Sequence, residues 1–311
     1  MDIFVKSRLD AAQIKERIKL GSTGIELYLD KGDLASLSLK DNLRLCSDNF
    51  SKVSLETGDR LYGTAPTDLL DSESREYIEK VLNIRSKIPN AGFLVIHLAG
   101  GCQVLDPPYK KLKVQVKKEI LEKSLATINE LDPENKVIAL ENTFPTDWMD
   151  EKNGIISFYP IGKLSSDFNR RIRTFDTGHS GITAFTLANL SQSKKGYVFN
   201  HRTFGEIPVY MADEEVKLAE IAKKSLTKAV LAEVKKANIV NVHLNNSRGL
   251  LDGFGVTEGG DIDLKAIIEA IIKRTNATIV TEVKERKTRD YINTPNQREM
   301  IDWLVNNYHA C

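Results

Sequence analysis

Five apolar runs of the chain each end on a residue whose side chain can bind a metal ion. The runs span 94–97, 137–141, 172–176, 239–243 and 279–282, and they end on His97, Glu141, Asp176, His243 and Glu282. A lone histidine or glutamate in such a place is more often a satisfied hydrogen-bonding group than a ligand. Together, however, these groups imply strand ends that converge, and clustered buried carboxylates call for a compensating cation.

The smallest coherent ligand set among these residues is Glu141, Asp176, His243 and Glu282. Three carboxylates and one imidazole suit Mn, Mg or Co, and they leave zinc open. The sequence therefore predicts one divalent metal ion at the place where these strand ends meet.

The apolar runs alternate with segments of helical periodicity. We expect strands at 3–5, 25–29, 53–56, 93–97, 137–141, 172–176, 239–243 and 279–282, and helices at 11–20, 34–46, 72–88, 112–128, from about 182, and at 216–237, 264–272 and 295–308. Alternating units of this kind predict an α/β protein with a parallel sheet, and eight of them predict a closed (β/α)8 barrel, a TIM barrel. The rival is an open doubly wound sheet. No GxGxxG motif follows the first strand, which disfavours the dinucleotide-binding version of that rival.

The length of 311 residues suits one such barrel, so we expect a single domain over 1–311. Two insertions, at about 143–171 and 191–213, are candidate pocket loops, because long loops at the C-terminal face of a barrel commonly shape substrate pockets. Surface elaboration or an oligomer contact is the alternative for both. His201, in the second insertion, is a further candidate site residue.

Composition narrows the classes of partner. Lys and Arg number 44 against 43 Asp and Glu, which disfavours nucleic acid as a partner but leaves a local basic patch open. The cysteines, Cys46, Cys102 and Cys311, are odd in number and form no CxxC pair, so a reducing cytoplasm fits best. We expect no signal peptide and no membrane span. A homo-oligomer is compatible with these features.

Four segments that contain the candidate ligands resemble a known family. They read Leu140-Glu-Asn-Thr143, Phe175-Asp-Thr-Gly-His179, Val242-His-Leu-Asn-Asn246 and Thr281-Glu282. In sequence order and spacing they are similar to the xylose-isomerase-like TIM barrel superfamily, over about 24–283. This superfamily holds sugar phosphate isomerases and epimerases, and also the endonuclease IV group (AP endonuclease family 2), which cuts DNA at abasic sites.

The epimerase branch needs only the four-ligand site. The resemblance implies a sugar or sugar-phosphate isomerase or epimerase that moves a proton through a metal-stabilised enediolate. It also implies that Glu141 and Glu282 are the acid/base pair as well as ligands, and that His179 and Arg248 contact substrate oxygens while His97 lines the pocket. A solvent-exposed loop charge is the alternative for Arg248. Dehydration by a lyase is a related reaction that the same site would support.

The endonuclease branch uses three zinc ions, and here the chain departs from its pattern. His97 matches one ligand of a neighbouring zinc, but Glu56 stands where a second histidine is expected. His179 and Asp252 match ligands of the third zinc, whereas Phe254 replaces its remaining histidine and cannot bind zinc. A metal-dependent hydrolase acting at abasic sites is therefore the second hypothesis. A catalytically inactive barrel used for binding is the third.

Overall fold

The computed structural model describes residues 1–58, 60–61, 65–66, 72–97, 114–142, 171, 173–193, 196–201, 205–209, 211, 213–285, 292 and 294–308. The first predicted insertion, 143–171, lies outside the described residues except for Arg171.

Eight parallel strands close into a barrel, as the sequence predicts. They are β1 (Ile3–Arg8), β2 (Gly24–Leu29), β3 (Lys52–Thr57), β6 (Ala91–His97), β7 (Ile138–Glu141), β8 (Arg173–Asp176), β12 (Ile239–Leu244) and β15 (Thr278–Thr281). Their order around the ring is β1-β15-β12-β8-β7-β6-β3-β2, and every pair of neighbours is parallel. The carboxyl ends of all eight strands therefore lie at one end of the barrel.

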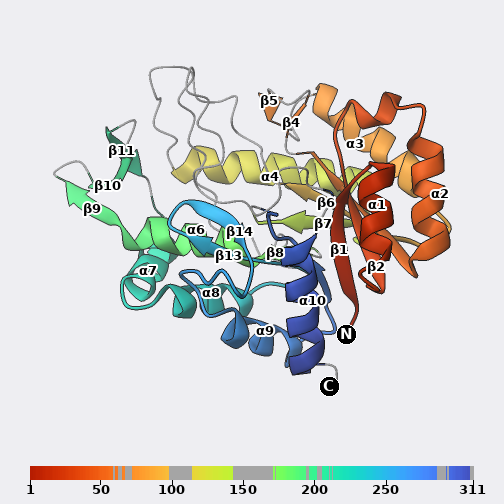
Figure 1. The fold of residues 1–311 in the computed structure, drawn as a ribbon. Helices are drawn as coiled ribbons and strands as arrows, with labels where there is room; N and C mark the ends of the chain where they lie inside the picture. Colours follow the sequence, from red (N-terminus) through yellow and green to blue (C-terminus); the bar gives the residue numbers. More distant parts are fainter. Residues whose placement is uncertain are drawn as a thin grey trace.

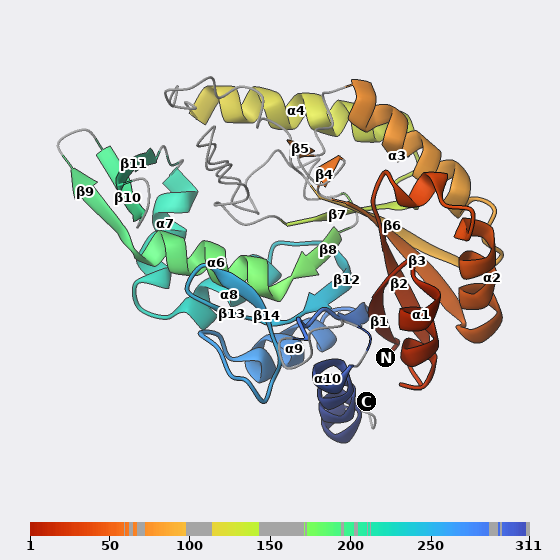
Figure 2. The ribbon, with the colours of Figure 1, turned by 45° about the horizontal axis from the view of Figure 1, so that its top comes forward.

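Helices surround this ring (Figures 1 and 2). They are α1 (Ala11–Ile18), the short 3-10 helix η1 (Asp33–Ala35), α2 (Leu39–Asn49), α3 (Ser72–Arg85), α4 (Val114–Leu131), α6 (Thr177–Ala188), α7 (Asp213–Ala222), α8 (Leu226–Val234), α9 (Leu264–Ile272) and α10 (Pro295–Tyr308). The predicted helices 264–272 and 295–308 are confirmed to the residue.

The helices expected over 11–20, 72–88 and 112–128 are α1, α3 and α4, with ends that differ by two or three residues. Three other predicted helices differ more from those observed. The helix expected from about 182 begins at Thr177, because the Asp176 side chain caps it. The helix expected over 216–237 is two helices, since Ser225 adopts an extended conformation and caps α8 by accepting a hydrogen bond from the amide of Lys228. The helix expected over 34–46 is replaced by η1 and α2.

Three small antiparallel sheets lie outside the barrel among the described residues. The second insertion, expected as a loop over 191–213, contains a three-stranded sheet made of β9 (Leu190–Ser193), β10 (Gly196–His201) and β11 (Gly205–Val209). It extends from the end of α6, away from the barrel strands (Figure 2). The pair β4 (Arg60–Leu61) and β5 (Ala65–Pro66) follows β3, and the hairpin β13 (Asn246–Arg248) and β14 (Leu251–Phe254) follows β12.

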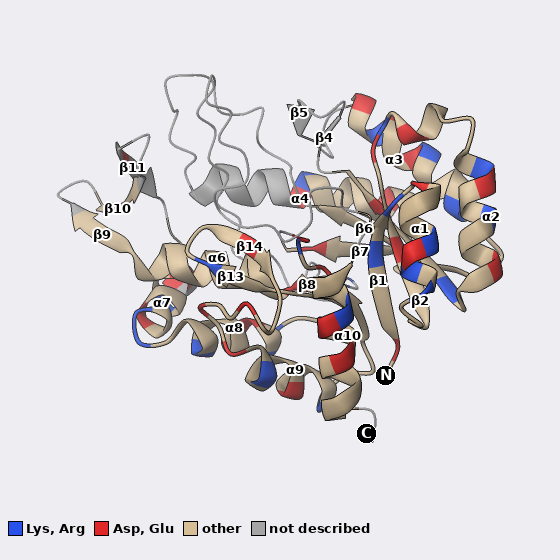
Figure 3. Cartoon of the chain, viewed as in Figure 1, with Lys and Arg blue, Asp and Glu red and all other residues tan. Residues whose placement is uncertain are grey.

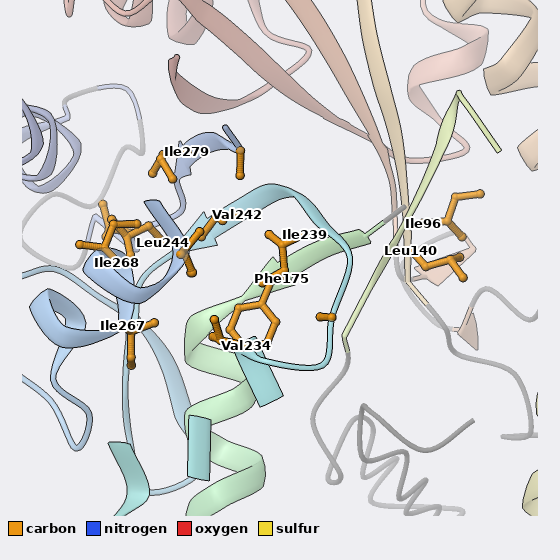
Figure 4. Close-up of a cluster of buried hydrophobic side chains, with 14 of the residues drawn as sticks. Ile96, Leu140, Phe175, Val234, Ile239, Val242, Leu244, Ile267, Ile268 and Ile279 are labelled. Atoms are coloured by element: carbon orange, nitrogen blue, oxygen red, sulfur yellow. The ribbon is translucent and has the colours of Figure 1, made fainter. Parts of the chain in front are cut away.

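The barrel strands are buried on both faces, and alternation decides which residue faces which side. Phe175, Val242 and Leu244 belong to an apolar cluster with residues of α8 and α9 (Figure 4). Since neighbours along a strand point to opposite faces, Asp176 and His243 point into the barrel. The same alternation turns Phe175, Val242 and Leu244 toward the helices.

Tyr77 ties α3 to the ends of two barrel strands, and its removal should destabilise the fold. Its buried hydroxyl donates a hydrogen bond to the Leu29 carbonyl at 2.6 Å and accepts one from the Gly58 amide at 3.0 Å. We expect Tyr77→Phe to lower the free energy of unfolding by about 1–3 kcal/mol, because two buried hydrogen bonds are lost, although the Gly58 amide still donates to the Leu29 carbonyl at 2.6 Å.

Urea unfolding of Tyr77→Phe beside Tyr308→Phe would check this expectation. Tyr308 is also buried, but in the part of the chain that is described its hydroxyl has no hydrogen-bond partner. Its change to phenylalanine should therefore cost little stability. Equal losses in the two variants would contradict a role for the Tyr77 hydrogen bonds.

The outer helices α1, α2 and α3 carry lysine and arginine interspersed with acidic residues (Figure 3). Several of these charges pair within a helix, as Arg75 does with Glu79 and Lys80 with Glu76. No helix among the described residues is long and apolar enough to cross a membrane.

Candidate metal centre

Four predicted ligands meet at the carboxyl end of the barrel. Glu141, Asp176, His243 and Glu282 each offer an atom, and these atoms lie within 4.8 Å of one another. Nδ1 of His243 lies 2.6 Å from Oε2 of Glu282, 3.2 Å from Oε1 of Glu141 and 4.0 Å from Oδ2 of Asp176. They come from β7, β8, β12 and the residue after β15, which are consecutive around the ring. The prediction that these strand ends converge is confirmed.

Two asparagines from the neighbouring strand ends hold Asp176 in place. The side chain of Asn245 donates to Oδ2 of Asp176 at 2.8 Å, and the Asn142 side chain both accepts from the Asp176 amide and donates to its carbonyl. Oδ1 of Asp176 accepts from the His179 amide at 2.6 Å, which is the capping bond of α6. Hydrogen bonds of this kind fix the orientation of a ligand carboxylate.

Gly178 is required by the close approach of Asn245. A Cβ atom at position 178 would lie 1.8 Å from Oδ1 of Asn245. We therefore expect Gly178→Ala to displace Asn245, to loosen Asp176 and to weaken metal binding by about 10–100-fold, the usual effect of losing such a supporting contact. Isothermal titration with Mn²⁺ or Co²⁺ would measure this effect.

Gly255→Ala is the matched control for that titration. A Cβ atom at position 255 would meet its nearest neighbours, in Glu258 and Val283, at 3.7 Å and 4.0 Å, which are ordinary contacts. This variant should bind metal like the unmodified chain. If Gly178→Ala also did so, the steric argument for Gly178 would be wrong.

The donor atoms of the cluster fit a cation. Both carboxylate oxygens of Glu141, both ring nitrogens of His243 and Oε2 of Glu282 are buried and make no hydrogen bond with the described part of the chain. Some of them lie within 3.5 Å of one another without the alignment that a hydrogen bond needs. Buried polar atoms are normally satisfied, so convergent unsatisfied ones indicate a ligand, and three carboxylates with one imidazole form a good donor set for a divalent metal.

The same groups influence one another's ionisation. Burial alone would raise the pKa of Glu141, but His243 and His97 lower it to about 2. Burial would lower the pKa of His243, yet Glu141 and Glu26 hold it well above its ordinary value. Burial raises the pKa of Asp176 to about 6, against the opposing effect of His179. Because metals bind deprotonated ligands, a cation would compete with protons at this cluster.

Three further predicted site residues adjoin Glu141. Nε2 of His97 lies 3.4 Å from Oε2 of Glu141, and Nδ1 of His179 lies 3.3 Å from Oε1. On its other side, Nε2 of His179 lies 3.6 Å from Oδ2 of Asp252, which forms an ion pair with Lys284. Glu56, His97 and Glu141 also offer atoms within 4.8 Å of one another. The structure thus brings His97, His179, Asp252 and Glu56 to the cluster.

Two other predicted residues lie apart from these contacts. Arg248 is exposed on β13, with its guanidinium carbon 4.7 Å from the centre of the Phe254 ring. Phe254 is itself buried. The backbone of His201 ends β10 in the three-stranded sheet, and its side chain lies outside what the structure describes. A substrate role for Arg248 and for His201 remains a prediction.

Lys6 is the main member of the cluster that the sequence pattern does not predict. Its ammonium nitrogen lies 3.0 Å from Oε1 of Glu26 and 3.3 Å from Oε2 of Glu282, and it also pairs with Glu56. Burial disfavours the charged form of this lysine, but Glu282 and Glu26 raise its pKa above the ordinary value. The predicted first strand stopped at Val5, whereas β1 continues to Arg8 and places Lys6 inside the barrel.

Glu26 also belongs to the cluster, and its position in the second strand predicts either a place in the pocket or a lysine partner. Its Oε1 lies 2.7 Å from Nε2 of His243, and its Oε2 accepts a hydrogen bond from the side chain of Asn241 at 3.1 Å. The signal for it was visible in the sequence: a charged residue between Ile25 and Leu27 in an apolar strand must point inward if its neighbours point outward.

Comparison with known proteins bears on the fold. No family model matches the sequence, and no curated protein matches it. Three solved structures align over nearly the whole chain. A 3-keto-D-glucoside 4-epimerase from E. coli is 13% identical, with 98% of this chain and 99% of that one aligned and a TM-score of 0.56. A xylose isomerase domain protein from Planctomyces limnophilus is 10% identical, with 100% of this chain and 99% of that one aligned and a TM-score of 0.55. A D-allulose 3-epimerase from Methylomonas sp. is 14% identical, with 98% of this chain and 97% of that one aligned and a TM-score of 0.54.

At these identities the likeness establishes the fold. The chain is a closed (β/α)8 barrel that is similar in fold to these three proteins. At the carboxyl end of its strands it holds a buried cluster of carboxylates and histidines whose donor atoms suit a metal ion.

Proposed function

We propose that this chain is a divalent-metal-dependent isomerase or epimerase of a sugar or sugar phosphate. The observation that carries the proposal is the cluster of Glu141, Asp176, His243 and Glu282, whose unsatisfied donor atoms converge at the strand ends. Two of the structural neighbours are sugar epimerases by name, which supports the same reaction class.

The proposed chemistry is proton transfer next to a sugar carbonyl. A bound Mn, Mg, Co or Zn ion would polarise that carbonyl and the adjacent hydroxyl, and so acidify the C–H bond between them. Glu282 is the most accessible of the four ligands, with 32% of its side chain exposed, against 1% for Glu141. We assign to Glu282 the removal or return of the proton from the open side, and to Glu141 the opposite transfer from within the barrel.

His179 and His97 would orient the substrate. Nδ1 of His179 lies 2.7 Å from the Asn142 carbonyl and Nε2 faces Asp252, so the ring is held in one orientation. Because Nδ1 is occupied by the Asn142 carbonyl, a proton for a substrate oxygen would come from Nε2, which lies 3.6 Å from Oδ2 of Asp252, and the fixed ring would deliver it at little entropic cost. Arg248 remains a proposed contact for substrate hydroxyls. Dehydration of a hydroxy-keto compound would use the same groups, and it is a proposed variant of the reaction.

The abasic-site hydrolase is the second candidate, and one observation favours it. Glu56, His97 and Glu141 form a further group that could hold a metal beside the four-ligand set. The third zinc site of the endonuclease hypothesis would need a ligand at position 254, but this position holds Phe254, which is buried beneath Arg248. The nuclease hypothesis therefore requires several bound metal ions, although the chain lacks one of the ligands that they need.

Metal analysis of protein purified without chelators tests the proposal. We expect one divalent ion per chain. Three zinc ions per chain would favour the nuclease hypothesis. If the chain bound no metal under any loading condition, only the hypothesis of a catalytically inactive barrel would remain. A cytoplasmic location and a homo-oligomeric state remain expectations from the sequence.

Two assays then separate the enzymatic readings. Because the sugar is unknown, proton transfer is best followed as solvent deuterium entering a panel of ketoses, aldoses and their phosphates. Incorporation at carbon supports the isomerase or epimerase. Nicking of duplex DNA that carries an abasic site, without deuterium incorporation, would overturn it.

A further inference from the structure

We infer that Lys6 serves as a built-in cation that limits the centre to one metal ion. The inference rests on the proposed metal site and adds its stoichiometry. It starts from the three groups of residues, among those described, that have metal-binding geometry: the four-ligand set, the group Glu26, Glu56 and His243, and the group Glu56, His97 and Glu141.

Glu56 is common to the second and third of these groups and absent from the first. Lys6 forms an ion pair with Glu56 and lies 3.0 Å from Oε1 of Glu26. Its ammonium group thus pairs with two members of the second group, Glu26 and Glu56. Glu56 is also a member of the third group. Within the four-ligand set, the ion pair that Lys6 makes is with Glu282, at 3.3 Å.

The topology holds Lys6 in this position. Strand β1 lies between β15 and β2, and its register places Lys6 directly opposite Glu26. From there its side chain reaches carboxylates of β2 and β3 and the one after β15. Only 12% of the lysine side chain is exposed, so solvent screens its charge weakly.

A second dication at Glu56 would have to approach this buried ammonium group. The ion and the ammonium group are both positive, and like charges that lie close together repel strongly where solvent is excluded. In addition, the positive charge of Lys6 already neutralises the carboxylates that would bind the ion. Lys6 therefore compensates Glu26 and Glu56 in the way a second metal would, and it leaves the four-ligand set as the one place for a divalent ion among these three groups of described residues.

The test is a count of bound Mn²⁺ by elemental analysis, together with Mn²⁺ electron paramagnetic resonance. The unmodified chain at saturating Mn²⁺ should bind one ion and give the spectrum of an isolated ion. Lys6→Met removes the charge but keeps an apolar stem, and it should bind two ions with the spectrum of a coupled pair. The double variant Lys6→Met with Glu56→Gln should return to one ion.

Lys284→Met is the matched control, because Lys284 is another lysine at this end of the barrel but pairs with Asp252. It should bind one ion. If Lys6→Met does not fold, as judged by circular dichroism, Lys6→Gln takes its place with the same expected count, since its amide can still donate to the buried carboxylates.

Two ions in the unmodified chain would overturn this inference and leave the proposed metal site standing. A folded, neutral Lys6 variant that still binds one ion would overturn it as well. No ion in any of these proteins would overturn the metal site itself, and the role of Lys6 with it.

Discussion

Glu282→Gln is expected to slow proton exchange between substrate and solvent by about 10²–10⁴-fold, the usual contribution of a positioned general acid or base. Glutamine has nearly the shape of glutamate but cannot accept the substrate proton. The carboxylate it replaces lies 2.6 Å from Nδ1 of His243 and 3.3 Å from the Lys6 ammonium group, on the more open side of the cluster. Among the four proposed ligands, Glu282 is thus the one best placed to reach a bound sugar.

The measurement is the rate of solvent deuterium incorporation at saturating metal, with the metal content determined on the same sample. This pairing matters because Glu282 is also a proposed ligand. Slow exchange in protein that holds its full metal complement would assign the loss to proton transfer. Glu79→Gln changes an exposed glutamate of α3 and should leave both quantities unchanged. Exchange at the original rate in metal-loaded Glu282→Gln would remove Glu282 from the acid/base role.

The barrel and its four-ligand set were predictable because a local pattern encodes them. Apolar runs that alternate with helical segments mark a parallel sheet, and the residue after an outward aliphatic side chain must point inward. Leu140 and Phe175 belong to the apolar cluster, so Glu141 and Asp176 had to face the centre. The strand order then brought them together without any further information from the sequence.

Features that depend on contacts between distant segments could not be predicted in this way. Lysine is rarely buried, so the sequence pattern predicts that the strand ends before Lys6, and the carboxylates that stabilise this lysine lie on other strands. The role of Gly178 becomes clear only when Asn245, from another strand end, is seen against it. By contrast, Ser225 is a cap signal that the sequence carries, and the apolar periodicity of 216–237 obscured it.

Asp176→Ala is expected to abolish metal binding at concentrations that saturate the unmodified chain. The change removes a proposed ligand, and it also leaves the Asn245 side chain without the carboxylate oxygen that it bonds at 2.8 Å. A metal ion stabilises the protein that binds it by about 2.7 kcal/mol at 100 times its dissociation constant. The melting temperature of the unmodified chain should therefore rise with added Mn²⁺ or Co²⁺ and fall again with a chelator, whereas that of Asp176→Ala should stay constant.

Asp176→Ala also removes the cap of α6, which by itself costs about 1 kcal/mol. Asp263→Ala controls for that loss, because Asp263 caps α9 in the same way, by accepting from the Ala266 amide at 3.1 Å, and belongs to none of the candidate metal-binding groups among the described residues. Both variants should melt below the unmodified chain, but only Asp263→Ala should regain stability with metal. A metal-dependent rise in Asp176→Ala equal to that of the control would show that the ion binds elsewhere.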